Sequence, residues 1–311
     1  MLKSLLHLVS PAGRRGRLST LIFHRVLPEQ DPIFPEEMHA RRFDEMCGWL
    51  KSWFNVLPLD AAATHLQQGT LPARAACITF DDGYADNHDV AMPILQRHGL
   101  TATFFVSTGF LDGGRMWNDT IIEAVRGCNS HILDLGELGS FVLRQPVEKA
   151  TAIDAIIRKV KYLPMPERLK ITEEIALTAG VRLPDSLMLE SAQVKSLRYG
   201  GMQVGAHTVS HPILATLSDE AARAEIKDGK LALERLLGEP VKLFAYPNGK
   251  PGADYTAAAV AIAREAGFSA AVSTSWGAAH CSGDIFQIPR FTPWDQSRVR
   301  FGSRLLGNLY R

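Results

Sequence analysis

The sequence has 311 residues, of which 46% are hydrophobic, and its formal net charge is +1. This length and composition predict a soluble globular protein with a large buried core. The near-neutral charge argues against a nucleic-acid-binding protein, although both ends of the chain are locally basic. The four cysteines are scattered without a CxxC pair, which favours neither a disulfide framework nor a cysteine metal site.

The N-terminal segment, residues 1–20, has a short apolar run that is followed, rather than preceded, by a basic cluster. This order is unlike that of a secretory signal peptide, and no stretch reaches the length of a transmembrane helix, so we expect a cytoplasmic protein. Residues 2–9 have the pattern of a short amphipathic turn, and a peripheral contact with the inner membrane is therefore a further expectation.

Short apolar and β-branched runs alternate with helical patterns along the chain. The runs are LIFHRV, FNVLPL, ACITF, TATFFVS, MQVGAH, VKLFAYP, FSAAVST and FQIPRF. This alternation predicts a parallel sheet wrapped by helices, and seven or eight such units indicate one α/β domain over residues 1–311, a single distorted (β/α)7–8 barrel. Residues 113–189 hold helical patterns and few strand signals, so we expect a helical insertion there that forms a lid or side wall.

Polar side chains occur at the ends of five of these predicted strands. They are His24, the pair Asp81 and Asp82, His207, Tyr246 and Arg290. Because the C-terminal ends of the strands meet on one face of such a barrel, we expect these side chains to line a common site.

Two adjacent carboxylates, Asp81 and Asp82, stand directly before a glycine. Turn formation needs only one acid there, and a second adds repulsion unless a cation or a proton-transfer role compensates it. In HTVSH, His207 and His211 are separated by three residues, and two such histidines in a loop are commonly just solvated. Together with a carboxylate from another strand end, they would form a His-His-Asp set that suits Zn²⁺ and also Co²⁺ or Ni²⁺.

At these residues the sequence resembles the polysaccharide deacetylases of carbohydrate esterase family 4, which contain the NodB homology domain. The resemblance rests on TFDDGYADN and HTVSHP, with support from FFVSTGFL and FAYPNG, and covers most of residues 21–293. It implies a deformed barrel and a metal-dependent hydrolase. By position, Asp81 corresponds to the catalytic base, and Asp82, His207 and His211 correspond to the metal ligands. The loop at AYPNG corresponds to the backbone N–H that holds the oxyanion.

The chain departs from the family where many members carry an arginine in an RPPYG-like motif. Ala245 and Asn248 occupy that motif here, in FAYPNG. We expect Arg290 of IPRF to replace the missing arginine beside the catalytic base, since a guanidinium in an apolar strand usually has a carboxylate partner. The alternative is an ordinary arginine at the surface or the edge of the core.

A second departure concerns the LxxH motif, which many members carry near the C-terminus and which is absent after IPRF. Residues 21–24 read LxxH instead, at the other end of the chain. First and last strands are neighbours in a closed barrel, so circular permutation would leave His24 in place as the general acid. The alternative is that His24 only caps its strand through a hydrogen bond.

Four further residues are expected to contact the substrate: Tyr84, Trp117, Tyr246 and Asn248. Tyr84 follows the two aspartates, and Trp117 stands at the start of the insertion, where its ring would stack on a pyranose. For both aromatic residues, packing in the core is the alternative.

The leading hypothesis is a metal-dependent enzyme that removes N-acetyl groups from a sugar of a surface polysaccharide, a glycolipid or its precursor. The expected partner is thus an N-acetylated glycan or glycolipid, and no nucleic acid. A deacylase of a non-sugar amide and a catalytically silent glycan-binding module are the alternatives. Asp81 argues against the silent module, which has no need of a base beside intact ligands.

Overall fold

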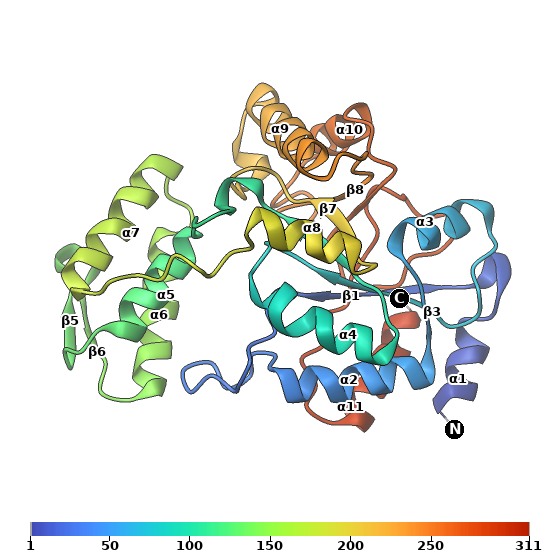
Figure 1. Ribbon diagram of the computed structural model, residues 1–311, viewed down its shortest axis with the longest axis horizontal. Helices are drawn as coiled ribbons and strands as arrows, with labels where there is room; N and C mark the ends of the chain where they lie inside the picture. The colour runs from blue at the N-terminus through green and yellow to red at the C-terminus, as the bar shows by residue number, and fades with distance from the viewer. Residues whose placement is uncertain (1, 311) are drawn as a thin grey trace. The chain divides into compact units, whose positions relative to one another are not determined.

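The computed structural model describes residues 2–310 (Figure 1). The chain divides into two compact units. The first unit comprises the chain up to Glu29, Met38–Leu111 and the chain from Leu189 onward, and the second comprises Gln30–Glu37 and Asp112–Met188. Within the described range, no helix combines the length and the apolar composition that crossing a bilayer requires.

Nine strands and eleven α-helices make up the regular structure of the described residues. The strands are β1 (Leu18–Phe23), β2 (Asn55–Val56), β3 (Ala75–Phe80), β4 (Thr103–Val106), β5 (Ile132–Asp134), β6 (Ser140–Val142), β7 (Gln203–Ala206), β8 (Leu243–Ala245) and β9 (Ala270–Val272). The helices are α1 (Leu2–Val9), α2 (Ala40–Trp53), α3 (Leu59–Gln68), α4 (Met92–His98), α5 (Trp117–Gly127), α6 (Pro146–Val160), α7 (Met165–Ala179), α8 (Ser191–Tyr199), α9 (Asp219–Leu237), α10 (Ala257–Glu265) and α11 (Arg298–Leu309).

Seven strands of the first unit form one parallel sheet in the order β1-β3-β4-β7-β8-β9, with β2 paired to the start of β3. An irregular segment after β9 joins the two edges of this sheet. The Ile288 N–H donates to the carbonyl of Ala271 in β9 (3.0 Å), and the Phe291 N–H donates to the carbonyl of Thr20 in β1 (2.7 Å). The sheet therefore closes on itself, and the prediction of a distorted (β/α) barrel is confirmed.

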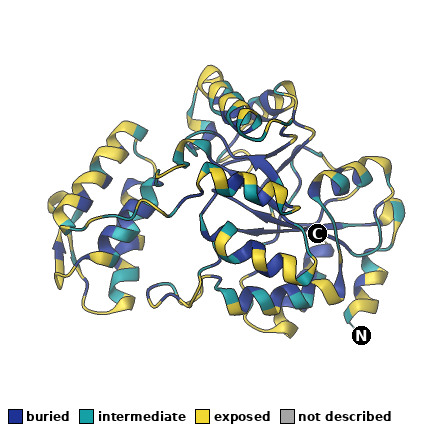
Figure 2. Cartoon of the chain, viewed as in Figure 1, coloured by how far each residue is buried: buried dark blue, intermediate teal, exposed yellow. Residues whose placement is uncertain are grey.

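The strands form because their sequences are continuous apolar runs. All six residues of β1 and all six of β3 are buried, as expected for parallel strands covered on both faces. Figure 2 shows the central strands of the first unit buried, whereas the helices around them carry exposed outer faces. Phe80 anchors the packing on the barrel, since its ring stacks on those of Phe23 (5.3 Å between centroids) and Phe104 (4.7 Å). The ends of β1, β3 and β4 are thereby fixed relative to one another.

The second unit contains α5, α6, α7 and the antiparallel pair β5-β6. Its core includes Ile121, Ile156 and Ile175 from the three helices and Ile33 from Gln30–Glu37. The helical insertion expected at residues 113–189 lies in this unit except for Leu189, which belongs to the first unit, whereas nothing in the sequence indicated that residues 30–37 join it. The assignment of residues 1–311 to one domain, and the role as a lid, stay predictions.

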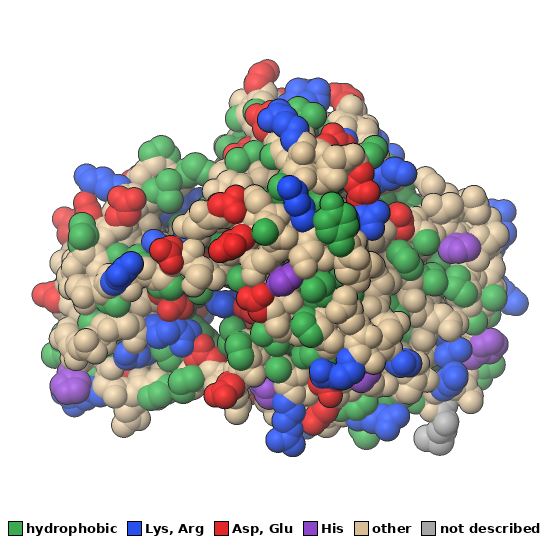
Figure 3. Space-filling model, in the orientation of Figure 1, with side chains coloured by type: hydrophobic (Ala, Val, Ile, Leu, Met, Phe, Trp, Pro, Cys, Tyr) green, Lys and Arg blue, Asp and Glu red, His purple; other side chains and the backbone are tan. Residues whose placement is uncertain are grey.

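The surface carries charges of both signs. Figure 3 shows acidic and basic side chains interspersed over the face that it displays, in keeping with 34 basic and 33 acidic residues in the whole chain.

Candidate active site

Two aspartates that follow β3 and two histidines that follow β7 lie close together in the first unit. The Nε2 atom of His207 lies 3.4 Å from Oδ1 of Asp82 and 3.9 Å from Oδ2 of Asp81. The Nε2 atom of His211 also lies 3.4 Å from Oδ1 of Asp82. The structure thus brings together the four residues that the two main motifs place at the ends of separate strands.

The turn after β3 sends the two neighbouring carboxylates to different partners. Asp82 has φ of +77° and Gly83 has φ of +88°, so the chain leaves the extended conformation immediately after Asp81. Aspartate tolerates this left-handed region better than most residues. Glycine suits the next position, because its φ of +88° is strained for other residues and a Cβ there would lie only 3.1 Å from Cγ1 of Val106. Asp81 therefore faces Arg290, and Asp82 faces the histidines.

Arg290 and Asp81 form a buried bidentate ion pair. Nη1 and Nη2 of Arg290 donate to Oδ1 and Oδ2 of Asp81, each over 2.6 Å, and the Nε–H donates to the carbonyl of Ser273 (2.8 Å). Burial raises the pKa of Asp81, but the Arg290 guanidinium together with the nearby histidines outweighs it and holds this pKa below its usual range. Arg290 is thus a core residue that keeps Asp81 ionised, not a surface arginine. Its part in the reaction stays a prediction.

Asp82, His207 and His211 form a group that suits a cation. One oxygen and two imidazole nitrogens lie within 4.8 Å of one another. Nδ1 of His207 donates to the carbonyl of Ala245 (2.8 Å), because a carbonyl only accepts, and this leaves the lone pair of Nε2 facing Asp82. Oδ1 of Asp82 is buried without a hydrogen bond although both Nε2 atoms are 3.4 Å away. A divalent ion between these donors would satisfy all three, so the residues fit a Zn²⁺-type site.

The surroundings shift the pKa values of Asp82, His207 and His211 in different directions. Burial raises the pKa of Asp82, but His211 and His207 outweigh it and hold this pKa well below its usual range. Burial lowers the pKa of His211 to about 4, so its imidazole is neutral near pH 7 and has a lone pair to share. Burial also lowers the pKa of His207, but Asp81 and Asp82 outweigh it and raise the pKa overall.

His24 follows β1 at the same end of the sheet and is exposed. Its charge is among those that lower the pKa of both Asp81 and Asp82, which places it within electrostatic reach of the site. The Nδ2 group of Asn87 donates to the His24 carbonyl (2.8 Å), and Asp86 accepts from the N–H of Val26 (3.0 Å). The sequence interpretation did not single out these two supporting residues, although both belong to the run YADN that follows the paired aspartates.

The predicted substrate residues of the first unit differ in accessibility. Tyr84 is buried, and the guanidinium of Arg25 lies 4.7 Å from the centroid of its ring. Tyr246 has no exposed surface and stacks on Tyr255 at 3.9 Å between centroids, so its ring is part of the core. Asn248 is half-buried with φ of +57° in the loop after β8. The substrate roles of these residues stay predictions.

Trp117 belongs to the second unit, where it begins α5. The guanidinium of Arg168 lies 4.8 Å from the centroid of its ring, and the Trp117 side chain lines a cavity of about 760 Å³ within that unit. The ring is half-buried, and its stacking on a sugar stays a prediction.

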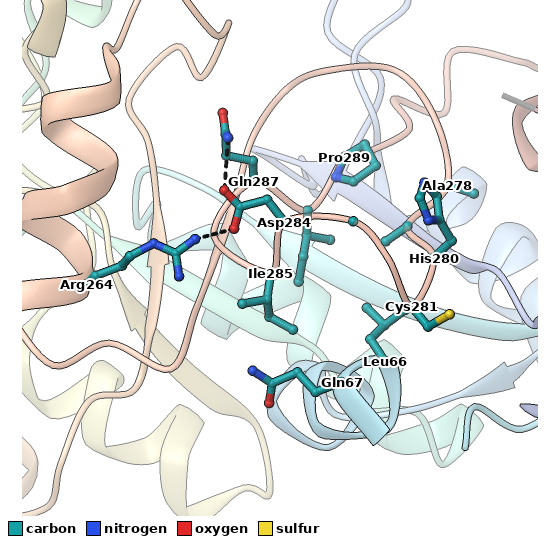
Figure 4. Close-up of a pocket in the computed structure, with 13 residues that line it drawn as sticks. Leu66, Gln67, Arg264, Ala278, His280, Cys281, Asp284, Ile285, Gln287 and Pro289 are labelled. Carbon is teal, nitrogen blue, oxygen red and sulfur yellow. Dashed lines mark hydrogen bonds and ion pairs between the residues drawn. The ribbon is translucent and has the colours of Figure 1, made fainter. Parts of the chain in front are cut away.

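A separate pocket of about 550 Å³ lies between α3 and the segment around Ala279 (Figure 4). Ala279 pairs with Leu18 at the start of β1, so this pocket is at the opposite end of the barrel from the strand ends that carry Asp81 and His207. Asp284 accepts hydrogen bonds there from Arg264 and from Gln287. The pocket contains none of the predicted site residues.

The site combines an aspartate paired to an arginine with a carboxylate–histidine group, both at the strand ends of a parallel barrel. This arrangement is typical of a hydrolase with a (β/α)-barrel fold. The sequence matches the family described as Polysaccharide deacetylase over residues 68–134 and 140–271. The chain therefore belongs to the polysaccharide deacetylase family, and the family expected from the sequence is confirmed.

Individual relatives are distant in sequence but similar in fold. The chain is 21% identical over 277 residues to YxkH of Bacillus subtilis (strain 168); the match covers 88% of this chain and 71% of the relative. The Streptococcus pyogenes deacetylase PplD in complex with acetate has a TM-score of 0.64 at 20% identity, covering 94% of this chain and 98% of that chain. IcaB from Ammonifex degensii has a TM-score of 0.61 at 19% identity, covering 97% and 99%.

Proposed function

We propose that this chain is a divalent-metal-dependent hydrolase that removes N-acetyl groups from a sugar of a surface polysaccharide, a glycolipid or its precursor. The observation that carries the proposal is the placement of the ionised Asp81 beside the group formed by Asp82, His207 and His211. A base and a set of cation ligands within 4 Å of each other are the two parts that amide hydrolysis by activated water requires.

Asp82, His207 and His211 would hold the ion, most simply Zn²⁺, with Co²⁺ or Ni²⁺ as substitutes. When bound, such an ion supplies Lewis-acid chemistry, because it polarises a carbonyl and acidifies water. With only three protein side chains to hold it, such an ion would stay accessible to other ligands, as in catalytic zinc sites.

Two side chains near this group carry the two proton transfers of the reaction, one as base and one as acid. Asp81 accepts the proton of the attacking water, while Arg290 fixes both of its oxygens. His24, exposed at the end of β1, donates a proton to the nitrogen of the departing amine. A backbone N–H of the loop after β8, around Asn248, holds the developing oxyanion of the acetyl group.

The acetyl group as substrate is supported by the neighbours in fold. PplD is described in complex with acetate, which is the acid that deacetylation releases, and another neighbour is described as a de-N-acetylase from Aggregatibacter actinomycetemcomitans. Asn248, half-buried in the loop after β8, is the proposed sugar contact; Tyr246 has no exposed surface to offer a sugar, and the contacts of Tyr84 and Trp117 stay predictions from the sequence. A cytoplasmic location with a peripheral contact at the inner membrane is proposed on the sequence alone.

We expect the purified protein to contain about one divalent ion per chain and to release acetate from N-acetylated glycans. A strong chelator should abolish this release and Zn²⁺ or Co²⁺ should restore it, because only three side chains hold the ion. Metal analysis and an acetate assay on a panel of N-acetylated sugars and non-sugar amides test this. Turnover of non-sugar amides alone would identify a different deacylase, and bound metal without any turnover would favour the glycan-binding module.

His24→Ala is expected to keep its metal and its stability but to lose most of its kcat. The alkaline limb of the pH–rate profile should flatten, because a general acid must be protonated when the amine departs. His280→Ala is the control, since His280 is also exposed and lies at the opposite end of the barrel. An unchanged alkaline limb with kcat within about threefold of wild type would return His24 to a structural role.

A further inference from the structure

Helix α9 contacts the loop that connects His207 to His211 through one carboxylate. Oε2 of Glu225 accepts hydrogen bonds from the backbone N–H groups of Val209 and Ser210, both over 2.9 Å. Oε1 of Glu225 accepts a third from the hydroxyl of Ser210 (2.6 Å). One half-buried side chain thus binds the two residues at the middle of the loop between the histidines.

The same face of α9 comes close to the loop one helical turn later, at Gly229. A Cβ at this position would lie 2.8 Å from both the carbonyl carbon and the oxygen of Thr208, which is closer than real Cβ contacts allow. Because residues four apart share a face of a helix, Glu225 and Gly229 act on the loop together. The glycine permits the close approach that lets the glutamate reach its three donors.

The loop needs such support because its backbone is in an unfavourable conformation at two non-glycine residues. Thr208 has φ of +67° and His211 has φ of +53°. Residues held in this region persist only when their surroundings fix them. Inside the loop, the Thr208 hydroxyl accepts from the N–H of His211 (3.1 Å). From outside, the N–H groups of Thr108 and Gly109 donate to the carbonyls of Thr208 (3.2 Å) and Val209 (2.8 Å). Glu225 binds the N–H groups of Val209 and Ser210, the two residues before His211.

We propose that Glu225 is a positioning residue that holds the two histidines at the spacing a cation requires. The proposal rests on the proposed metal-dependent function. His207 is fixed independently through the carbonyl of Ala245, so Glu225 acts chiefly on the position of His211 relative to His207 and Asp82. A loop released from Glu225 has access to conformations in which His211 leaves the cluster, and each of these competes with binding of the ion.

The effect on metal binding can be separated from an effect on stability by a control on the same helix. Glu234 of α9 is also half-buried, and its Oε1 accepts from the backbone N–H of Val241 (3.0 Å), which belongs to the loop before β8 rather than to the histidine loop. Glu225→Ala and Glu234→Ala each remove a carboxylate that binds backbone N–H groups. Only the first of them touches the loop between the cation ligands.

The test is a Co²⁺ titration of the metal-free full chain, followed by visible absorption of the bound ion and by competition with a chelator. We expect the Kd for Co²⁺ to rise by about 10–100-fold in Glu225→Ala, the usual cost of losing an outer partner of a metal ligand, with an altered Co²⁺ spectrum. Glu225→Gln should stay within about threefold of wild type, because an amide oxygen accepts two N–H groups and its NH₂ donates to the Ser210 hydroxyl. Glu234→Ala should also stay within about threefold.

Each outcome decides a different point. A Kd and a spectrum of Glu225→Ala equal to wild type would overturn the positioning role and leave the proposed metal function standing. A wild-type chain that binds no Co²⁺ would overturn the proposed metal function and this inference with it. Equal losses in the Glu225→Ala and Glu234→Ala variants would show a general effect of weakening α9 and overturn the inference. Should Glu225→Ala not fold, Glu225→Asp provides the comparison, because its shorter side chain withdraws the carboxylate from the loop.

Discussion

Asp81→Asn is expected to lower turnover by about two to four decades while the metal content stays at the wild-type level. The amide has nearly the same shape as the carboxylate but cannot accept the proton of water, and Asp81 is not among the three cation ligands. Stability should fall as well, by up to about 3–5 kcal/mol, because Arg290 would be left as a buried charge without its counter-charge. Rates are therefore to be compared at a temperature where circular dichroism shows the variant folded.

Arg290→Gln is the matched control, because it breaks the same ion pair but keeps the carboxylate of Asp81. We expect it to retain at least about ten times the activity of Asp81→Asn, since the base remains present. Without the guanidinium, burial dominates and raises the pKa of Asp81, so the acid limb of the pH–rate profile should move to higher pH. A wild-type rate for Asp81→Asn at full metal content would remove Asp81 from the mechanism.

The barrel could be predicted from the sequence because a parallel strand covered on both faces is a continuous apolar run. The run at β3 is one such case, and all six of its residues are buried. The segment FQIPRF was also read correctly as part of the barrel, although it forms only isolated bridges, from Ile288 to Val272 and from Phe291 to Leu21. The joining of Gln30–Glu37 to the second unit could not be predicted, because it depends on tertiary contacts such as the ion pair of Asp31 with Arg126 (2.6 Å).

That Asp81, Asp82, His207 and His211 lie close together could be predicted, because all four follow strands of one parallel sheet, but which of them contact one another could not. That Asp81 and Asp82 face different partners follows from the positive φ of Asp82, which no residue type dictates. The contact of Arg290 with Asp81, by contrast, could be predicted although it spans 209 residues of sequence, because closure of the barrel brings these two strand ends together. Glu225 was missed because a lone glutamate on an amphipathic helix has the same pattern as a solvated one.

The direction of a side chain beyond a strand end is a second property that the sequence does not indicate. Tyr246 follows β8 just as His207 follows β7. The Tyr246 ring nevertheless points into the core, whereas the imidazole of His207 points toward Asp82 and His211. The period of two along a strand sets which side chains alternate in and out, but residues beyond the strand end are placed by the turn that follows. Position at a strand end therefore predicted the neighbourhood of Tyr246 and not the direction of its side chain.

His211→Ala is expected to raise the Kd for Zn²⁺ by more than about a hundredfold and to abolish acetate release. Loss of a residue that only hydrogen-bonds to a metal ligand costs about 10–100-fold in metal affinity. This variant removes one of only three ligands, so its effect should be larger. The fold should survive, because the His211 side chain is 19% exposed and stands in a loop.

His98→Ala is the control for this variant, because its imidazole is 21% exposed and also lies beside a carboxylate, 2.8 Å from Oδ1 of Asp44. It should lose a comparable histidine–carboxylate contact and keep its metal affinity. Isothermal titration of both metal-free variants with Zn²⁺ measures the difference. Equal affinities would mean that the ion binds elsewhere, and then the lone pair of His211, neutral because burial lowers its pKa to about 4, would serve another purpose.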